Sequence, residues 1–356
     1  MKPLEFFEAA IRTPSPSGYE EKIQKLVREY LAETTRDVAI DVHGNLTARA
    51  GDPEGPRLML AGHCDQIGML ISHIDEEGFL YAQTIGGWDP QQLIGQAMTI
   101  WTAGGPVAAV ISRKPIHLLT QKERGEVVQL DQMWLDIGAK DQEEAKKTVR
   151  IGDPVTLDLT YRPLLGSLVS GPGMDNKSGM WTVIETARRC ATPGDDDPLR
   201  CHLHSVATVQ EEIGLRGAKT AAGRIQPDVA IAVDVTHASD CPTINKQQQG
   251  DIRLGGGPVI VRGPNINPKV AQRLIDLAEA NDIPYQLAAL GRAAPNDSNV
   301  LQISGAGVAT GLVAIPNRYM HSAVETISLD DIEQIAALLT LFARSLTPDC
   351  DFIPGE

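Results

Sequence analysis

The chain has 356 residues, 42% of them hydrophobic and 22% charged, and its 46 acidic and 32 basic residues give a formal net charge of −14. This length is typical of two domains or of one domain with an insertion, and the composition is that of a folded rather than a disordered protein. The negative charge disfavours nucleic acid and anionic membranes as partners, because their phosphates would be repelled.

The cysteines and the N-terminus indicate the cellular compartment. The five cysteines are odd in number, scattered and without a Cys-x-x-Cys pair, so neither a disulfide framework nor a zinc knuckle is predicted. The first residues lack the apolar region of a secretion signal, and no run of 18 apolar residues predicts a membrane span. We therefore expect a cytoplasmic protein.

The first seventy residues are predicted to form two helices and a buried strand. The helices are expected over 3–11 and 19–31, with a turn rich in proline and serine between them. Residues 57–63 form an apolar run that ends in a histidine, as in a strand that leaves the core at that point.

Between residues 70 and 167 the pattern changes to short strands separated by glycine and proline. These strands are expected at 98–101, 107–111, 127–130 and 155–159, with a short helix at 143–147. We predict a small, inserted β-barrel-like domain at 70–167. Residues 1–69 and 168–356 would together form the other domain.

The rest of the chain alternates apolar strands with helical patterns. Strands are expected at 203–210, 228–233 and 308–315, and helices at 178–190, 268–281 and 329–346. This alternation is typical of an α/β fold, in which helices cover a largely parallel sheet. Ligands of such folds bind beyond the carboxyl ends of the strands.

Side chains that can bind metals stand at or beyond these strand ends. Imidazole nitrogen and carboxylate oxygen suit zinc, cobalt or manganese, and a shared carboxylate can hold two ions about 3.5–4 Å apart. The five candidate ligands are His63, Asp175, Glu212, Asp234 and His321.

Neighbouring residues suggest supporting roles. Asp65 follows His63 by two residues and is placed to accept the second N–H of that imidazole. Glu211 and Glu212 are adjacent, and because like charges push their pKa values apart, one can ligate while the other serves as the general base of a hydrolysis. His237 lies three residues beyond Asp234 and is a candidate for lining the pocket.

Five segments together resemble the M42 family of metallo-aminopeptidases. They are 61–68 (AGHCDQIG), 173–179 (GMDNKSG), 210–218 (QEEIGLRGA), 233–237 (VDVTH) and 318–322 (RYMHS). The resemblance continues through 86–90 (GGWDP) and 262–268 (RGPNINP), so it covers nearly the whole chain in order.

The resemblance implies two divalent metal ions per chain and assigns their ligands. The first ion would be bound by His63, Asp175 and Asp234, and the second by Asp175, Glu212 and His321. Glu211 would be the general base, Asp65 the carboxylate behind the first histidine, and the peptide bond between Asp175 and Asn176 would be cis.

The resemblance also implies the fold, the substrates and the assembly. The expected fold is an α/β/α sandwich of the zinc-peptidase type, whose inserted domain helps to build a hollow, tetrahedral homododecamer from dimers that admits short peptides. Where many members carry Gly-Thr-Asp-Ala near the substrate pocket, this chain has Pro295-Asn296-Asp297-Ser298. Asp297 is thus a candidate pocket residue in a changed setting, and the preferred N-terminal residue is left unassigned.

Three other functions are considered. A dinuclear amidohydrolase or deacylase for small molecules would use the same five ligands. An endoglucanase-type hydrolase also uses paired carboxylates, but it needs no metal pair and usually offers aromatic platforms, whereas this chain is only 4% aromatic. A peptide-binding scaffold without catalysis is disfavoured because all five ligands and Glu211 are present.

Overall fold

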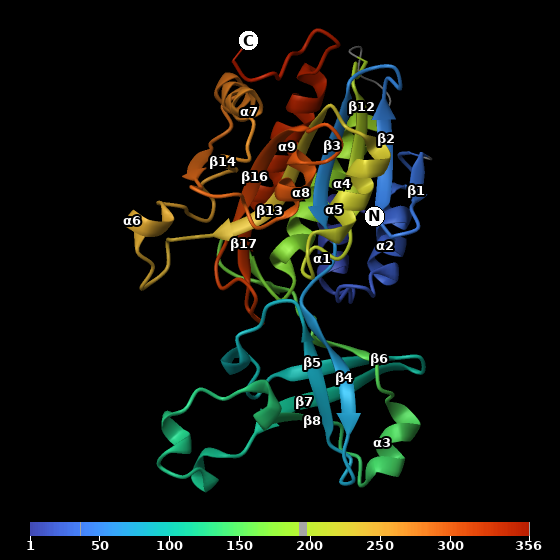
Figure 1. Cartoon of the computed structure of the whole chain (residues 1–356), viewed down its shortest axis with the longest axis vertical. Coiled ribbons are helices and arrows are strands. Elements are labelled where there is room, and N and C mark those ends of the chain that lie inside the picture. Colours follow the sequence, from blue (N-terminus) through green and yellow to red (C-terminus); the bar gives the residue numbers. More distant parts are fainter. Residues whose placement is uncertain (36, 192–197, 356) are drawn as a thin grey trace.

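An eight-stranded sheet forms the centre of the larger domain. The structure is a computed structural model that describes residues 1–35, 37–191 and 198–355. The strands follow the order β1-β2-β12-β3-β13-β16-β14-β15 across the sheet (Figure 1). Their bounds are β1 (Val38–Ile40), β2 (Leu46–Gly51), β3 (Arg57–His63), β12 (His202–Thr208), β13 (Val229–His237), β14 (Val259–Arg262), β15 (Gln286–Ala289) and β16 (Ala309–Asn317).

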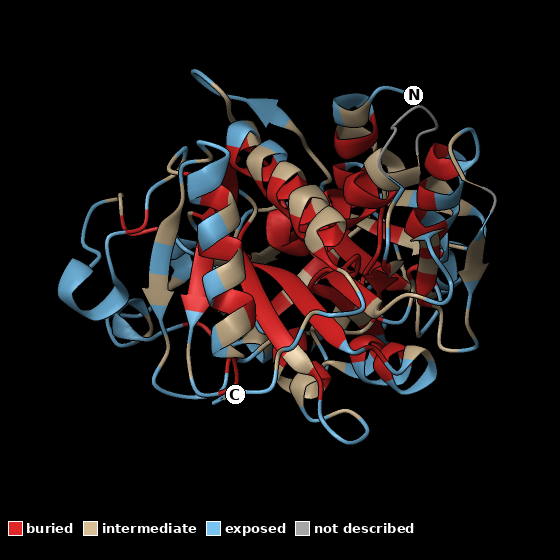
Figure 2. Ribbon diagram, turned by 90° about the horizontal axis from the view of Figure 1, so that it is seen from above, coloured by how far each residue is buried: buried red, intermediate tan, exposed pale blue. Residues whose placement is uncertain are grey.

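Helices cover both faces of this sheet, so the predicted α/β sandwich is confirmed. One layer contains α1 (Pro3–Ile11), α2 (Glu21–Leu31), α4 (Met174–Ala191), α7 (Pro268–Ala280) and α9 (Leu329–Ser345), with α4 packed against both α9 and the strands. The other layer contains α5 (Arg216–Ile225) and α8 (Asp297–Gln302). Figure 2 shows that buried residues concentrate in the sheet and on the helix faces against it.

The four central strands run parallel and end at one edge. β12 pairs with β3 so that Thr208 lies opposite His63, and β13 pairs in parallel with both β3 and β16. This edge faces the smaller domain (Figure 1). Polar residues at the ends of these strands are therefore brought together although they are far apart in sequence.

The smaller domain is a closed barrel of six strands, in the order β4-β5-β8-β7-β6-β9. The barrel strands extend from residue 68 to residue 157, compared with an expected insert of 70–167. Their bounds are β4 (Gly68–Ile74), β5 (Leu80–Ile85), β6 (Ala97–Thr102), β7 (Gly105–Arg113), β8 (Met133–Asp136) and β9 (Pro154–Leu157).

The chain returns from the barrel through a small sheet attached to the larger domain. In this sheet β11 (Leu168–Ser170) pairs antiparallel with both β10 (Arg162–Pro163) and β17 (Thr326–Ser328). Because β17 leads directly into α9, this sheet ties the end of the insert to the C-terminal helix.

Local signals explain most helix boundaries. α7 starts with Pro268 after Asn267, whose side chain accepts hydrogen bonds from the backbone N–H groups of Lys269 and Val270. α9 starts after Ser328, whose hydroxyl accepts a hydrogen bond from the N–H of Asp330. These two helices therefore begin where the sequence predicts.

Some elements differ from the prediction. The strand expected at 127–130 is wrong: residues 130–132 form a 3-10 turn bounded by Gln129 and Gln132, and the strand begins at Met133. Val127 is 56% exposed, whereas Val128 is buried in the barrel core, so this segment packs against the barrel without pairing as a strand. The sequence analysis also missed α5 and α8, because α5 buries only glycine and alanine and α8 has six residues.

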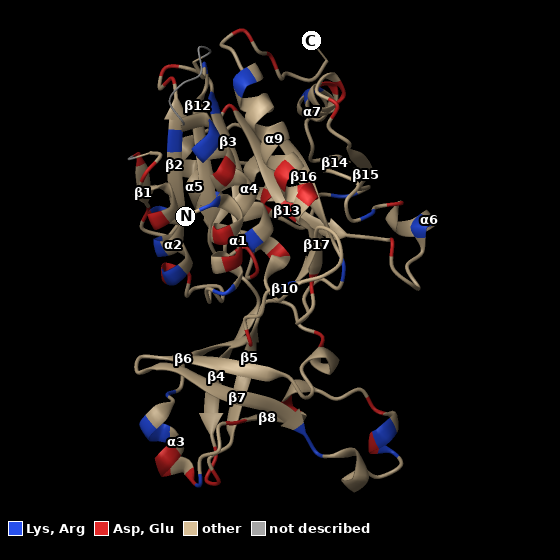
Figure 3. Cartoon of the chain, turned by 180° about the vertical axis from the view of Figure 1, so that it is seen from behind, with Lys and Arg blue, Asp and Glu red and all other residues tan. Residues whose placement is uncertain are grey.

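Charged positions occur on both domains (Figure 3). The barrel helix α3 (Gln142–Thr148) has two glutamates in its first turn and two lysines in its last, which is the arrangement that the helix dipole favours. Among the helices of the described residues, we find none that is both long and apolar enough to span a bilayer.

We predict that Gly62→Ala destabilises the larger domain, because β3 and α4 approach closely there. A Cβ at Gly62 would lie 2.6 Å from the carbonyl carbon and oxygen of Gly179, and neither backbone can yield without moving α4. Thermal unfolding should show a lowered midpoint, equivalent to about 1–3 kcal/mol.

Gly223→Ala provides the control. Gly223 lies inside α5, and a Cβ there would meet nothing within 4 Å. This substitution should raise stability by about 0.5–1 kcal/mol. An unchanged midpoint for Gly62→Ala would show that α4 can shift at no cost.

Candidate metal centre

A first group of three donors gathers at the carboxyl edge of the sheet. His63 ends β3, Asp234 lies in β13 and Asp175 lies in the first turn of α4. Their ligand atoms lie within 4.8 Å of one another, and all three residues are buried. His63 Nε2 is 3.3 Å from Asp175 Oδ1 and 3.8 Å from Asp234 Oδ1.

A second group of three donors shares Asp175 with the first. Glu212 follows β12 and His321 follows β16, and with Asp175 their ligand atoms again lie within 4.8 Å of one another. His321 Nε2 is 3.3 Å from Asp175 Oδ2 and 3.5 Å from Glu212 Oε1. All five ligand candidates are thus assembled into two groups.

Asp175 links the two groups through its two oxygens. Oδ1 faces His63 and Oδ2 faces His321, so one carboxylate can serve both groups. The peptide bond between Asp175 and Asn176 is cis, as the family resemblance implied. The Asn176 side chain donates to the carbonyl of Val233, which fixes this turn to the strand that carries Asp234.

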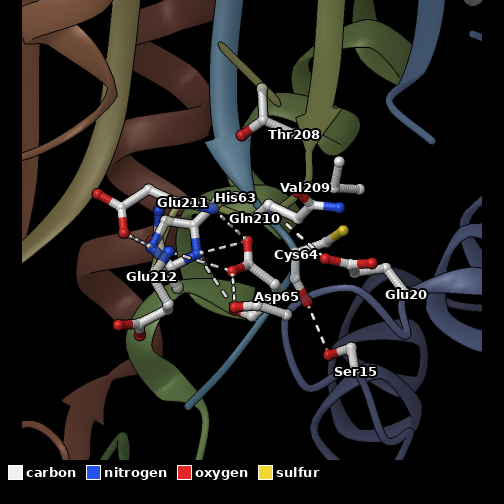
Figure 4. Close-up of polar contacts among 12 residues, drawn as sticks. Ser15, Glu20, His63, Cys64, Asp65, Thr208, Val209, Gln210, Glu211 and Glu212 are labelled. Atoms are coloured by element: carbon white, nitrogen blue, oxygen red, sulfur yellow. Dashed lines mark hydrogen bonds and ion pairs between the residues drawn. The ribbon is translucent and has the colours of Figure 1, made fainter. Parts of the chain in front are cut away.

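Asp65 holds both His63 and the loop of the paired glutamates (Figure 4). Its Oδ1 lies 3.4 Å from His63 Nδ1 and accepts the N–H of Glu211 at 3.0 Å. Its Oδ2 accepts the N–H of Glu212 at 3.2 Å and the hydroxyl of Ser17 at 2.5 Å. The role of Asp65 is therefore wider than the histidine contact that the sequence suggested.

Two further buried carboxylates support the site, and the sequence analysis missed both. Glu325 accepts the backbone N–H of Asp175 at 3.0 Å and that of His321 at 2.7 Å, so it holds one residue of each group. Glu20 accepts the N–H of Gln210, just before Glu211. The spacing of Glu325, four residues after His321, is the one sequence signal that could have drawn attention to it.

Burial and crowding perturb the titration of these groups. Burial, followed by the charges of Asp234 and other nearby carboxylates, raises the pKa of Glu211 well above its usual value, against the opposing charge of His63. Burial also raises the pKa of Asp234 and of Glu325, the latter to about 8. The opposite holds for Asp65, because hydrogen bonds from His63 and Ser17 outweigh burial and lower its pKa.

The residues fit a divalent cation. Glu212 Oε1 is buried without a hydrogen-bond partner, and burial raises the pKa of Glu212 as it does that of Asp234. A bound cation would offset the repulsion between these carboxylates. The imidazole and carboxylate donors suit zinc, cobalt or manganese rather than a purely oxygen-ligated ion.

The two candidate pocket residues occupy different positions. Asp297 starts α8 and is only 3% exposed; Thr208 donates to its Oδ2, and its Oδ1 is buried without a partner. His237 is exposed at the last residue of β13. Because it follows Asp234 by three residues, strand alternation directs its side chain to the opposite face of the sheet.

Comparisons with known proteins give the family. The profile of the M42 glutamyl aminopeptidases matches residues 44–338. The chain belongs to the M42 peptidase family. Among the relatives of this M42 peptidase, a lysyl aminopeptidase of Pyrococcus furiosus is 36% identical over 355 residues, which cover 98% of this chain and 99% of the relative. Membership makes the chain an exopeptidase hydrolase of the aminopeptidase type and implies that it uses divalent metals.

Solved structures agree with this assignment. The TET aminopeptidase of a marine sediment archaeon of the Thaumarchaeota superposes with a TM-score of 0.92 at 32% identity, covering 97% of this chain and 96% of that one. The TET1 peptidase of Pyrococcus horikoshii, which can assemble into a tetrahedron or a large octahedral shell, superposes with a TM-score of 0.85 at 30% identity, covering 97% and 100%.

We predict that Asp65→Asn weakens metal binding by about 10–100-fold, the usual effect of losing a carboxylate behind a ligand histidine. The amide keeps one acceptor oxygen, but it loses the charge and cannot accept from both Glu211 and Glu212 as the carboxylate does. Competition with a chromogenic chelator would measure the affinity.

Asp351→Asn is the matched control, because Asp351 forms a surface ion pair with Lys269 on the C-terminal segment. Its metal affinity should equal that of the wild type. Equal affinities for Asp65→Asn and the wild type would contradict the supporting role of Asp65.

Proposed function

We propose that this M42 peptidase removes N-terminal residues from short peptides at a centre of two divalent metal ions. The observation that carries the proposal is the placement of Asp175, whose two oxygens lie 3.3 Å from His63 Nε2 and 3.3 Å from His321 Nε2. Each imidazole completes a group of three donors, one with Asp234 and the other with Glu212. A shared carboxylate between two such groups is the usual arrangement of dinuclear hydrolases.

His63, Asp175 and Asp234 would hold one ion, and Asp175, Glu212 and His321 the other. Zinc and cobalt, and also manganese, match these donors. When bound, the ions supply a Lewis acid that polarises the scissile carbonyl and acidifies a water.

Glu211 is proposed as the general base. It belongs to neither donor group, yet its Oε2 lies 3.8 Å from His63 Nε2, and its side chain is nearly buried. From this position its carboxylate can take a proton from the attacking water and then deliver it to the departing amine nitrogen. Asp65 holds the backbone N–H of Glu211 and so keeps this base at the centre.

Asp297 and His237 stay predictions as pocket residues. Asp297 is buried and accepts a hydrogen bond from Thr208, the last residue of β12, so it lies close to the segment that leads into Glu211. The names of the family and of its relatives refer to different N-terminal residues, glutamyl and lysyl, so the preferred residue has to be measured on this chain.

We also propose that residues 70–167 act as an assembly and lid domain in a homododecamer built from dimers. The barrel has large apolar side chains on its surface, with Ile116, Leu118 and Val127 at least 56% exposed, and such side chains are typical of contact surfaces. The tetrahedral assembly of the Pyrococcus horikoshii relative supports this reading. A cytoplasmic location also stays a prediction, based on the scattered cysteines of the sequence.

Light scattering of the purified full-length chain tests the assembly. We expect the mass of twelve chains at micromolar concentration, because exposed apolar surface on the barrel would be covered in the particle. A mass of one or two chains at all concentrations would contradict the proposed assembly and leave the catalytic proposal intact.

Glu211→Gln tests the chemistry. Metal-stripped protein would be loaded with zinc, cobalt or manganese and assayed on aminoacyl-anilides, short peptides, N-acetylated amino acids and a glucose oligomer. We expect metal-dependent release of N-terminal residues, and a kcat about 10²–10⁴-fold lower in the variant, because glutamine cannot carry the proton.

Glu29→Gln is the control, since Glu29 is exposed on α2 and forms a 3.8 Å surface pair with Lys25. It should match the wild type on every substrate. Cleavage restricted to the acetylated amino acids would favour the deacylase, and cleavage restricted to the oligomer would favour the endoglucanase.

A further inference from the structure

One ligand histidine is held by a carbonyl of the inserted barrel. His321 Nδ1 lies 2.7 Å from the carbonyl oxygen of Gly87, two residues beyond the end of barrel strand β5. With Nδ1–H donating to this oxygen, Nε2 faces Asp175 and Glu212 and is the nitrogen left to bind a metal ion. The larger domain contributes the histidine, and the barrel determines its tautomer and ring direction.

Further contacts join the same two segments. Ala323, two residues after His321, packs against the hydrophobic core of the barrel, as does Trp88. The indole N–H of Trp88 donates to the carbonyl of Gly68 at 2.9 Å and so anchors the loop 86–88 to the first barrel strand. The backbone of Gly86 lies so close to Glu212 that a Cβ there would be 3.3 Å from Glu212 Oε2.

The first group of donors does not depend on the barrel in this way. His63, Asp175 and Asp234 all come from the larger domain, and His63 Nδ1 is held by Asp65 of the same domain. Within the described residues, the contacts that the barrel makes with the two donor groups therefore fall on His321 and Glu212, which belong to the second group alone.

We propose that the barrel loop 86–88 is a positioning element for the second metal ion, so that docking of the barrel completes that half of the centre. The proposal rests on the two-metal function above. It predicts that loosening this loop weakens the second ion and leaves the first in place, whereas backbone strain elsewhere in the barrel affects neither.

The main test is a calorimetric titration of metal-stripped, full-length protein with cobalt. Wild type should bind two equivalents per chain. In Gly86→Ala the new Cβ would lie 2.6 Å from Ile67 Cγ2 at a φ of +77°, so the loop must move. We expect one equivalent at wild-type affinity and the second weakened about 10–100-fold.

Gly138→Ala is the matched control in the same barrel. Gly138 has a φ of +76° but nothing within 4 Å of a new Cβ, so the backbone strain is the same without displacement of the loop. Both equivalents should bind as in the wild type. Size-exclusion chromatography would establish that the wild type and all variants have the same assembly state during the titration.

Trp88→Phe tests the position of the loop without adding an atom near Glu212. It removes the hydrogen bond to Gly68 and touches neither ligand, and loss of one such bond should weaken the second ion by about threefold to tenfold. Wild-type binding in both Gly86→Ala and Trp88→Phe would overturn the proposal. So would weakening in Gly86→Ala alone, since Glu212 would then explain it.

Two other results of the same titration would contradict either this proposal or the two-metal function. Equal weakening of both ions in the loop variants would show a general structural role and overturn the proposal. Binding of fewer than two ions by the wild type would instead contradict the two-metal function on which the proposal rests.

Discussion

The repulsion among buried carboxylates around Asp175 is the constraint on which the site depends. Asp175, Asp234, Glu211 and Glu212 lie within a few ångströms of two imidazoles, and all are largely buried. Burial raises the pKa of most of these groups because an isolated buried charge is unfavourable. A bound cation would offset the repulsion within such a cluster, so the burial of these carboxylates fits the divalent metals that the family implies.

The α/β scaffold makes the crowding possible. Parallel strands end at a common edge, so β3, β12, β13 and β16 deliver side chains to one small region without any local sequence spacing. The close approach of β3 and α4 at Gly62 and Gly179 then brings Asp175 against His63. Packing of apolar layers thus supplies the force that holds like charges together.

Hydrogen bonds from backbone N–H groups to buried carboxylates hold these crowded side chains in a defined geometry. Asp65 accepts from the loop of Glu211 and Glu212, and Glu325 accepts from both Asp175 and His321. Each of these carboxylates satisfies N–H groups on loops from different parts of the chain. The barrel takes part as well, because Gly87 orients His321, so the two domains form a single functional unit rather than a catalytic body with an appendage.

By itself the sequence predicted many of the helices and strands and singled out the candidate ligands. Hydrophobic periodicity and caps gave α1, α7 and α9 and the strands β3 and β16, since these signals act within a few residues. The family resemblance gave His63, Asp175, Glu212, Asp234 and His321 in two groups, which the structure assembles. Tertiary structure alone decided the rest: that Glu325 and Ser17 support the candidate site, that Asp297 is buried beside Thr208, and that a barrel carbonyl contacts His321. Those contacts join residues up to 234 positions apart, and their partners become neighbours only when the layers pack, so no local pattern could encode them.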